Sequence, residues 1–408
     1  MGSFSIALTG LEADTVQLNT IGNNLANLNT SAFKTQNSAF EDLFYQQIGT
    51  SGSNDAIQVG VGTRVSQTVT NYTQGSLSTT GNSTDMALSG AGFFVVQQAG
   101  SQQLTRAGNF ELDSSGNLIT MQGASVMGYG ATAGVVNTNS GLVPLQMPVG
   151  TTQAAHATSN VTLTANLNAG ATVGTSFTSP VTVYDSLGTT HSATITYTLA
   201  SPNTWNYAIA LPAGDATGVT GNTGTLTFNS SGQLVTPASN VSSGTFTGLT
   251  DGASNLSFKW NLYDAKGNPL ITQSTAASST TATNQDGFAS GVYQSFSVDA
   301  SGVITASFSN GQTEAVGQVA VASIANQQGL VLAGNNNYTT SPASGLPSIG
   351  LAGTGGRGTI VGSALEQSNV DISSEFADLI VAQRAFEANS KTMTTFDTVT
   401  QDTLGMIR

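Results

Sequence analysis

The sequence predicts a mainly β protein with α-helical coiled-coil ends and nested, discontinuous domains. Apolar residues recur at steps of three and four near both ends, which is the repeat of a coiled coil. Only 8% of the 408 residues are charged and 47 are glycine, so turns and short strands should dominate the middle. A chain of this length holds about two to four domains with cores of their own.

The C-terminal helix is expected from Ile372 onward, with Asp371 or Ser373 as its cap. Its three-four seam is narrow, and the polar residues Gln383 and Ser390 interrupt it. Such a stripe buries little surface alone, so the helix needs a partner. The apolar seam residues are Ile372, Phe376, Leu379, Phe386 and Met393.

The first 28 residues carry a matching stripe, interrupted once by Asp14. Two such stripes are expected to meet, and two arrangements are open. One is a helical hairpin within a single chain, and the other is a seam between copies in a polymer. The N-terminal seam residues are Phe4, Ala7, Leu11, Leu18, Ile21, Leu25 and Leu28.

Charge and composition exclude several classes of protein. Nine basic against 22 acidic residues give a net charge of −13, and the basic residues are scattered, so nucleic acid is not an expected partner. The chain has no cysteine, which removes disulfides and thiolate chemistry. No run of apolar residues approaches the ~18 needed to span a bilayer, and the N-terminus lacks the pattern of a cleavable signal peptide.

A four-residue turn pattern recurs along the β region, with Asp or Asn first and Gly fourth. The first residue caps the turn and the glycine takes the left-handed conformation. Calcium loops are the rival interpretation, but the distal Glu and the flanking helices of an EF-hand are missing. The turns begin at Asp113, Asp185, Asn229, Asp264 and Asp299.

The residues predict no catalytic site, no cofactor-binding site and no metal site. The stretch 353–358 fits G-x-G-x-x-G, but it neither follows a strand nor opens a helix, so a hinge is expected instead of a phosphate loop. His156 and His191 have no local acidic or histidine partner at ligand spacing, so packed or surface histidines are expected. An enzyme is therefore not expected.

Both ends resemble the bacterial flagellar axial proteins, the family of rod, hook and hook-filament junction subunits. Residues 362–376 and 379–391 are similar to the closing motif of that family. Ala32 departs from the family pattern, which has glycine before the phenylalanine. The N-terminal motif is carried by Asn23, Asn24, Ala26, Asn27, Thr30, Phe33 and Lys34.

An inserted β-sandwich or barrel is expected in the middle of the chain, and residues 183–188 resemble the outer domain of hook proteins in particular. The size of this insert favours a hook subunit over a rod subunit. The expected domains are a terminal coiled-coil domain (1–30 and 363–408), a linker region (31–72 and 340–362), an inner β-domain (73–145 and 286–339) and an outer β-domain insert (146–285).

The resemblance implies a structural subunit that assembles with itself into a flexible tube and transmits torque from rod to filament. It also implies contacts with rod and hook-filament junction proteins, and with the hook cap and export apparatus during assembly. The expected location is the extracellular hook, reached without a cleaved signal peptide or membrane insertion. Alternatives are a rod or junction subunit, or, in a different class, a secreted β-rich adhesin or polysaccharide-acting enzyme.

Overall fold

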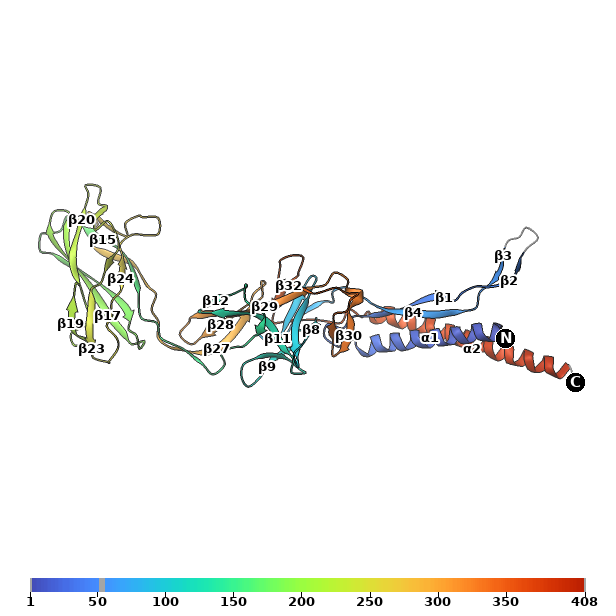
Figure 1. Ribbon diagram of the computed structural model, residues 1–408. Helices are drawn as coiled ribbons and strands as arrows, with labels where there is room; N and C mark the ends of the chain where they lie inside the picture. Colours follow the sequence, from blue (N-terminus) through green and yellow to red (C-terminus); the bar gives the residue numbers. More distant parts are fainter. Residues whose placement is uncertain (1, 51–55, 407–408) are drawn as a thin grey trace. The chain divides into compact units, whose positions relative to one another are not determined.

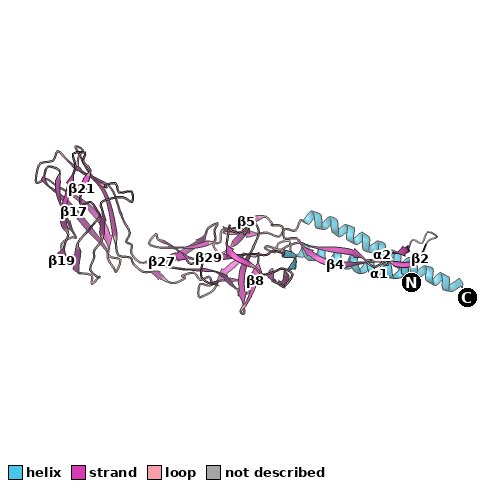
Figure 2. Ribbon diagram, turned by 45° about the horizontal axis from the view of Figure 1, so that its top comes forward, coloured by secondary structure: helices cyan, strands magenta, loops and turns pink. Residues whose placement is uncertain are grey.

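The computed structural model describes residues 2–50 and 56–406, which form two compact units. The first unit comprises Met1–Val149, Ser295–Ala306 and Glu314–Arg408, and the second comprises Gly150–Gln294 and Ser307–Thr313. Strands dominate both units, and a long helix lies near each end of the chain (Figure 2). The predicted mainly β fold with helical ends is confirmed.

The two terminal helices are α1 (Gly2–Ala26) and α2 (Ile372–Met406), and they lie side by side in the first unit (Figure 1). Asp371 caps α2 as predicted, because its Oδ1 accepts hydrogen bonds from the N–H groups of Ser373 (2.8 Å) and Ser374 (3.1 Å). Within the described residues, neither helix contains a segment apolar enough to cross a lipid bilayer.

Residues 36–70, expected as a linker, instead form two antiparallel strand pairs in the part that the structure describes. Strand β1 (Gln36–Asp42) pairs with β4 (Thr63–Thr70), and β2 (Gln46–Thr50) pairs with β3 (Ala56–Val59). The β1–β4 pair lies along α1, where the hydroxyls of Thr20 and Ser38 are 3.0 Å apart. These strands are largely polar and exposed, so the apolar alternation that marks a half-buried strand is weak.

A large sheet forms the centre of the first unit, around a core that includes Phe93, Leu104 and Tyr338. Its main path is β29 (Thr313–Ser323), β11 (Ser125–Thr132), β7 (Phe93–Gln98), β8 (Ser101–Thr105), β31 (Asn337–Thr339) and β30 (Val331–Gly334). Attached to this path are β9 (Phe110–Leu112), β10 (Leu118–Thr120), β12 (Val135–Val136), β13 (Val143–Pro144) and β32 (Ser348–Leu351).

Further strands complete the first unit or extend its large sheet. Two small antiparallel pairs lie in the first unit, and three strands continue the path of the large sheet beyond β29. The pairs are β5 (Leu77–Thr79) with β34 (Ala364–Glu366), and β6 (Met86–Ser89) with β33 (Thr359–Gly362). The remaining elements are β14 (Thr152–Gln153), β27 (Gly291–Val298), β28 (Val303–Phe308) and the short 3-10 helix η1 (Gln327–Gly329).

The second unit is a β-sandwich, whose two sheets are joined by an isolated bridge between Gln233 and Thr272 and do not close into a barrel. Its buried core includes Tyr197, Trp205 and Trp260. One sheet has the order β16 (Ser176–Tyr184), β17 (Thr190–Ser201), β18 (Thr204–Ala210), β20 (Thr223–Phe228) and β21 (Leu234–Thr236). The other contains β22 (Val241–Ser242), β24 (Lys259–Asn261), β15 (Asn160–Asn168), β25 (Ile271–Ser274) and β26 (Ser279–Gln285), and β19 (Ala216–Thr220) pairs with β23 (Thr245–Leu249).

All five predicted turns are confirmed. In each one, the first side chain accepts hydrogen bonds from the backbone N–H groups two and four residues later. The fourth residue is a glycine whose φ lies between 75° and 85°. The side-chain oxygen therefore acts as the turn's cap, which is the role that the sequence pattern predicts.

His191 corrects one sequence-based expectation, because it does have acidic partners. Its Nε2 lies 3.0 Å from Oδ2 of Asp185, and its Nδ1 lies 3.0 Å from Oδ2 of Asp215. Burial favours the neutral ring, but the hydrogen bonds with Asp215 and Asp185 raise the pKa of His191 above its ordinary value. Asp215 is 24 residues away in the sequence, so a search for local partners misses it.

Two turn glycines give a matched test of the second unit. Both have φ near 80°, but a Cβ on Gly232 would lie 1.9 Å from the carbonyl oxygen of Gln273, whereas a Cβ on Gly267 would meet nothing within 4 Å. We expect Gly267→Ala to cost about 1–2 kcal/mol for backbone strain. Gly232→Ala should cost about 1–3 kcal/mol more because the backbone must also move. Urea unfolding followed by tryptophan fluorescence measures both, and equal losses would contradict the predicted clash.

Candidate assembly surface

The two terminal helices meet through small and polar residues. A Cβ on Gly10 would lie 2.7 Å from Nδ2 of Asn389, so a larger residue here would displace the amide of Asn389. Nδ2 of Asn389 donates a hydrogen bond of 2.8 Å to Oδ2 of Asp14. Nearer the C-terminal end of α1, Nδ2 of Asn24 donates one of 3.0 Å to Oε1 of Glu375. These two contacts run in opposite order along the two helices, which are therefore antiparallel.

The predicted seam residues fall into three groups in this single chain. Ala7 and Ile21 are buried, and Ile372, Phe376 and Phe386 are exposed. The others are partly buried, namely Leu11, Leu18, Leu25, Leu28, Leu379 and Met393. The side chain of Phe4 lies outside the described residues.

An outer apolar stripe, formed by Ile372, Phe376 and Ile380, follows one face of α2. These residues are spaced by four and are exposed by 44%, 52% and 59%, so they share a face that the contact with α1 leaves open. The inward contacts of α2 are made by Glu375 and Asn389, and Ala382 is also buried. Helix α2 therefore has one side that faces its own chain and an apolar side available to other molecules.

The N-terminal motif ends α1 and turns the chain. Asn27 Nδ2 donates to the carbonyl oxygen of Asn23 (2.9 Å), and Oγ1 of Thr30 donates to Oδ1 of Asn27 (3.1 Å). Asn24 is buried and also bonds both backbone groups of Gln36, at 2.8 Å to its oxygen and 3.0 Å to its nitrogen. Ala26 is exposed at the end of the helix. The asparagines are thus tied to the turn that joins α1 to β1.

The last two motif residues, Phe33 and Lys34, are buried, and Lys34 forms an ion pair with Glu366 of β34. Nζ of Lys34 lies 2.6 Å from Oε1 of Glu366 and also donates to the carbonyl oxygen of Thr73 (2.8 Å). Burial lowers the pKa of Lys34, and the hydrogen bond to Glu366 opposes part of that shift. A second cation, Arg106, lies 3.6 Å from Oε2 of Glu366, so one carboxylate serves two buried positive charges.

Ala32 explains why the family pattern has glycine at this position. Its φ is 58°, in the left-handed region, and it is buried with its N–H donating to the carbonyl oxygen of Glu366 (2.8 Å). A side chain in this region costs about 1–2 kcal/mol. The chain thus keeps a strained backbone at the point where its two ends meet.

Family models match most of the chain. The flagellar basal body rod protein model matches residues 4–34, and the C-terminal model of flagellar basal body rod FlgEFG proteins matches residues 361–406. The D1 domain model of flagellar hook proteins FlgE/F/G matches residues 87–167, and the FlaE D2 domain model of flagellar basal body proteins matches residues 168–288.

Several known proteins are similar to this chain over its full length. The flagellar hook protein FlgE of Escherichia coli K12 is 33% identical, over 97% of this chain and 98% of that protein. The chain belongs to the flagellar hook protein FlgE family. The FlgE of Treponema pallidum is 32% identical over 100% of both chains. A crystal structure of the Helicobacter pylori flagellar hook protein FlgE2 shares the fold, with a TM-score of 0.55 over 71% of this chain and 100% of that one, at 16% identity.

Several contacts between the two ends of this FlgE-family chain were not predicted from the sequence. Glu366, Glu375 and Asn389 all lie inside the C-terminal stretch that carries the family resemblance, yet apolar spacing alone gives them no role. Their residue type could have pointed to them, because charged and amide side chains need hydrogen-bonding partners when they are buried.

The strain at Ala32 predicts that Ala32→Gly stabilises the first unit by about 1 kcal/mol, since glycine adopts this φ without steric cost. Calorimetric unfolding of the purified chain measures the change. Ala315→Gly, in strand β29, is the control and should instead cost roughly 0.5–1 kcal/mol. A loss of stability in both variants would show that Ala32 is not strained.

Because Glu366 faces both Lys34 and Arg106, we expect its loss to destabilise the first unit more than the loss of Lys34. Glu366→Gln leaves Lys34 and Arg106 as buried cations without an anion and should cost about 3–5 kcal/mol. Lys34→Met should cost less, because Glu366 keeps Arg106 and the N–H of Gly75 (2.9 Å).

The control for this order is Glu41→Gln, which breaks the exposed pair between Glu41 and Arg64 and should leave the free energy of unfolding almost unchanged. Calorimetry of the first unit ranks the three variants. The interpretation fails if Lys34→Met is as damaging as Glu366→Gln.

Proposed function

We propose that copies of this chain polymerise into the tubular hook of a bacterial flagellum, where they form a flexible joint that passes torque from rod to filament. The relatives named flagellar hook protein support this, because the similarity covers essentially the whole chain. The observation that carries the assembly step is the outer apolar stripe of α2, which a single copy leaves exposed.

Burial of this stripe supplies a driving force for polymerisation. Fully burying one large apolar side chain contributes about 1.5–3 kcal/mol, and every copy in a tube would repeat the contact. Ile372 and Phe376 are predicted seam residues, whereas Ile380 was not predicted and lies four residues after Phe376 on the same face. The partly buried seam residues of α1 and α2 would complete this helical layer.

Both helical ends would then form the inner layer of the tube, and the β-sandwich of the second unit would form an outer layer. The sandwich surface is rich in Ser, Thr and Asn, so its contacts between copies would be weak and polar. Contacts of this kind can exchange when the tube bends. A structural role of this kind requires no catalytic residue.

The further partners follow from the family. We expect end-to-end contacts with rod and hook-filament junction proteins, and transient contacts with the hook cap and the export apparatus. The expected location is the extracellular hook, reached without cleavage of a signal peptide. Salt-induced polymerisation of the purified chain, followed by electron microscopy, tests the proposal, and a chain that stays monomeric would contradict it.

A charge in the outer stripe should block assembly without unfolding the subunit. Phe376→Asp replaces a side chain that is 52% exposed in the single chain, so the free energy of unfolding should change by no more than about 0.5 kcal/mol. Polymerisation should fail, because each contact would bury an unpaired carboxylate. Light scattering and electron microscopy measure the assembly.

The matched control is Val173→Asp in the second unit, where Val173 is 64% exposed. This variant adds the same charge at a similarly exposed apolar site outside the helices, and it should polymerise. Tubes formed equally well by both variants would exclude the outer stripe as an assembly contact.

A further inference from the structure

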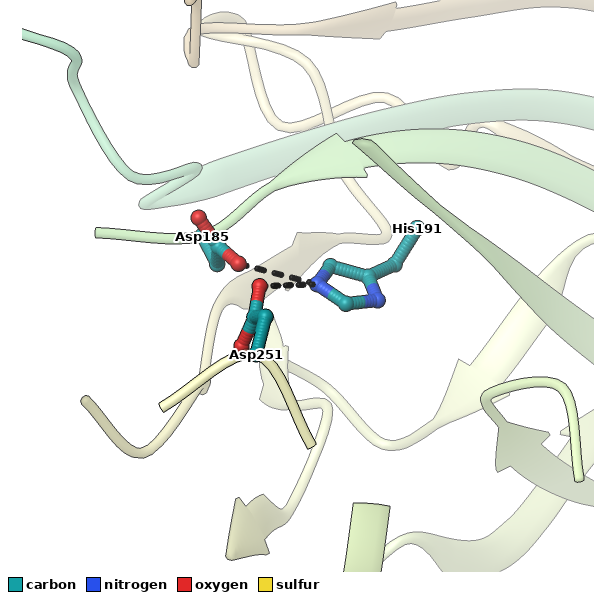
Figure 3. A group of neighbouring side chains, drawn as sticks. All are labelled: Asp185, His191 and Asp251. Carbon is teal, nitrogen blue, oxygen red and sulfur yellow. Dashed lines mark hydrogen bonds and ion pairs between the residues drawn. The ribbon is translucent and has the colours of Figure 1, made fainter. Parts of the chain in front are cut away.

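Three carboxylates surround His191 at one end of the β-sandwich. Asp185 follows β16, His191 lies near the start of β17, Asp215 precedes β19 and Asp251 follows β23. Oδ2 of Asp185 and Oδ2 of Asp251 both point at Nε2 of His191, at 3.0 and 3.8 Å (Figure 3). Oδ2 of Asp215 lies 3.0 Å from the other ring nitrogen. One imidazole therefore faces more negative charge than it can neutralise.

The contact with Asp215 orients the ring of His191 in the way that a carboxylate usually orients a metal-binding histidine. An ionised carboxylate only accepts hydrogen bonds, so Nδ1 of His191 must carry the proton in that contact. By the same argument Nε2 donates its proton to Oδ2 of Asp185 in the metal-free chain. A metal ion would replace that proton and take the Nε2 lone pair, which points toward the oxygens of Asp185 and Asp251. A carboxylate on the far nitrogen is the usual arrangement behind a metal-binding histidine.

The distances suit a small divalent ion. Four ligands placed tetrahedrally about 2.1 Å from a metal lie about 3.4 Å from one another. The two distances from Nε2 of His191, 3.0 and 3.8 Å, lie on either side of this value. The ligand atoms of all three residues fall within 4.8 Å of one another. Small movements would bring them into place, and water would complete the coordination.

The loops that carry these residues are already connected. The N–H of Thr250 donates to the carbonyl oxygen of Asp215 (3.1 Å), and the N–H of Ser254 donates to Oγ of Ser186 (2.9 Å). Asp185 is fully buried, and its Oδ1 is held by the turn, which leaves Oδ2 free to point at the histidine. Hydrogen bonds within the protein therefore hold these segments together without a metal.

We propose that Asp185, His191 and Asp251 bind a divalent first-row transition metal ion, with Asp215 as a positioning residue. An imidazole with two carboxylates suits zinc and similar ions, whereas calcium and magnesium prefer sites made only of oxygen. The ion would tie the turn between β16 and β17 to the loop after β23, and it would stabilise the sandwich by binding only the folded state. The sequence analysis predicts no metal site, and this proposal departs from it.

The test uses the full-length chain after treatment with a chelator. Titration with Zn²⁺ should show one saturable site by calorimetry and raise the unfolding temperature of the second unit, which Trp205 and Trp260 report by fluorescence. Ca²⁺ should do neither. Co²⁺ should give the visible absorption of a tetrahedral site. A chain that ignores Zn²⁺ and Co²⁺ holds a proton at Nε2 instead, and that result would overturn the proposal.

Variants separate this site from adventitious binding. Asp251→Asn, at a partly exposed position, should abolish the saturable Zn²⁺ site. Asp264→Asn, which alters a turn of the same type elsewhere in the sandwich, should keep it. His156→Gln should also keep it, since His156 is the other histidine of the chain. Unchanged Zn²⁺ binding by Asp251→Asn would overturn the proposal.

Asp215→Asn gives a graded readout that does not depend on losing a ligand. Removing a carboxylate behind a metal-binding histidine weakens metal affinity by about 10–100-fold. We therefore expect weakened but measurable Zn²⁺ binding and a retained Co²⁺ spectrum. Affinity equal to that of the unaltered chain would show that the contact with Asp215 has no positioning role and would contradict the arrangement proposed here.

Discussion

The buried ion pair between Lys34 and Glu366 is the contact on which the arrangement of the chain ends depends. The two residues are 332 positions apart, and most of the β structure lies between them in sequence. A buried pair is stable only when its other hydrogen-bonding groups are also satisfied. The carbonyl oxygen of Thr73 accepts from Lys34, and the N–H of Gly75 donates to Oε1 of Glu366. Oε2 of Glu366 has no hydrogen bond and faces Arg106 at 3.6 Å, so four separate segments meet at one point. The end of α1 and the start of α2 are therefore held close to this ion pair.

Because these two helix ends are held together, α1 and α2 can pair through little apolar surface. Polar contacts across a helix pair specify register at a cost in stability, and here Asp14–Asn389 and Asn24–Glu375 have that role. Close approach at Gly10 brings the polar groups within reach. The large apolar residues of α2 are then left exposed on the outside of the single chain.

The parts of the fold that follow from local rules were predictable from the sequence. A capping side chain and a glycine with positive φ are set within four residues, so the turns and the start of α2 at Asp371 could be placed. The alignment of α1 could not. The apolar repeat includes Leu11 and Leu18, whereas the structure turns Gly10 and Asn24 toward α2. Asp14, the polar position of the predicted stripe, does face α2. Apolar spacing identifies a candidate contact face, but that face need not be the one used within a single chain.

The turn at Asp185 shows how a local rule and a distant contact share one side chain. In each turn, one carboxylate or amide oxygen caps the backbone. At Asp113 and Asp264 the second oxygen accepts a hydrogen bond from an asparagine four residues later, at 2.7 and 2.9 Å. After Asp185 that position is Thr189, and the free oxygen bonds His191 instead. The missing asparagine alone is no signal, because the turn at Asp299 has Val303 at this position and bonds only its own residues. Asp215 and Asp251 arrive from other loops, so only the folded sandwich brings the full set of carboxylates to the histidine.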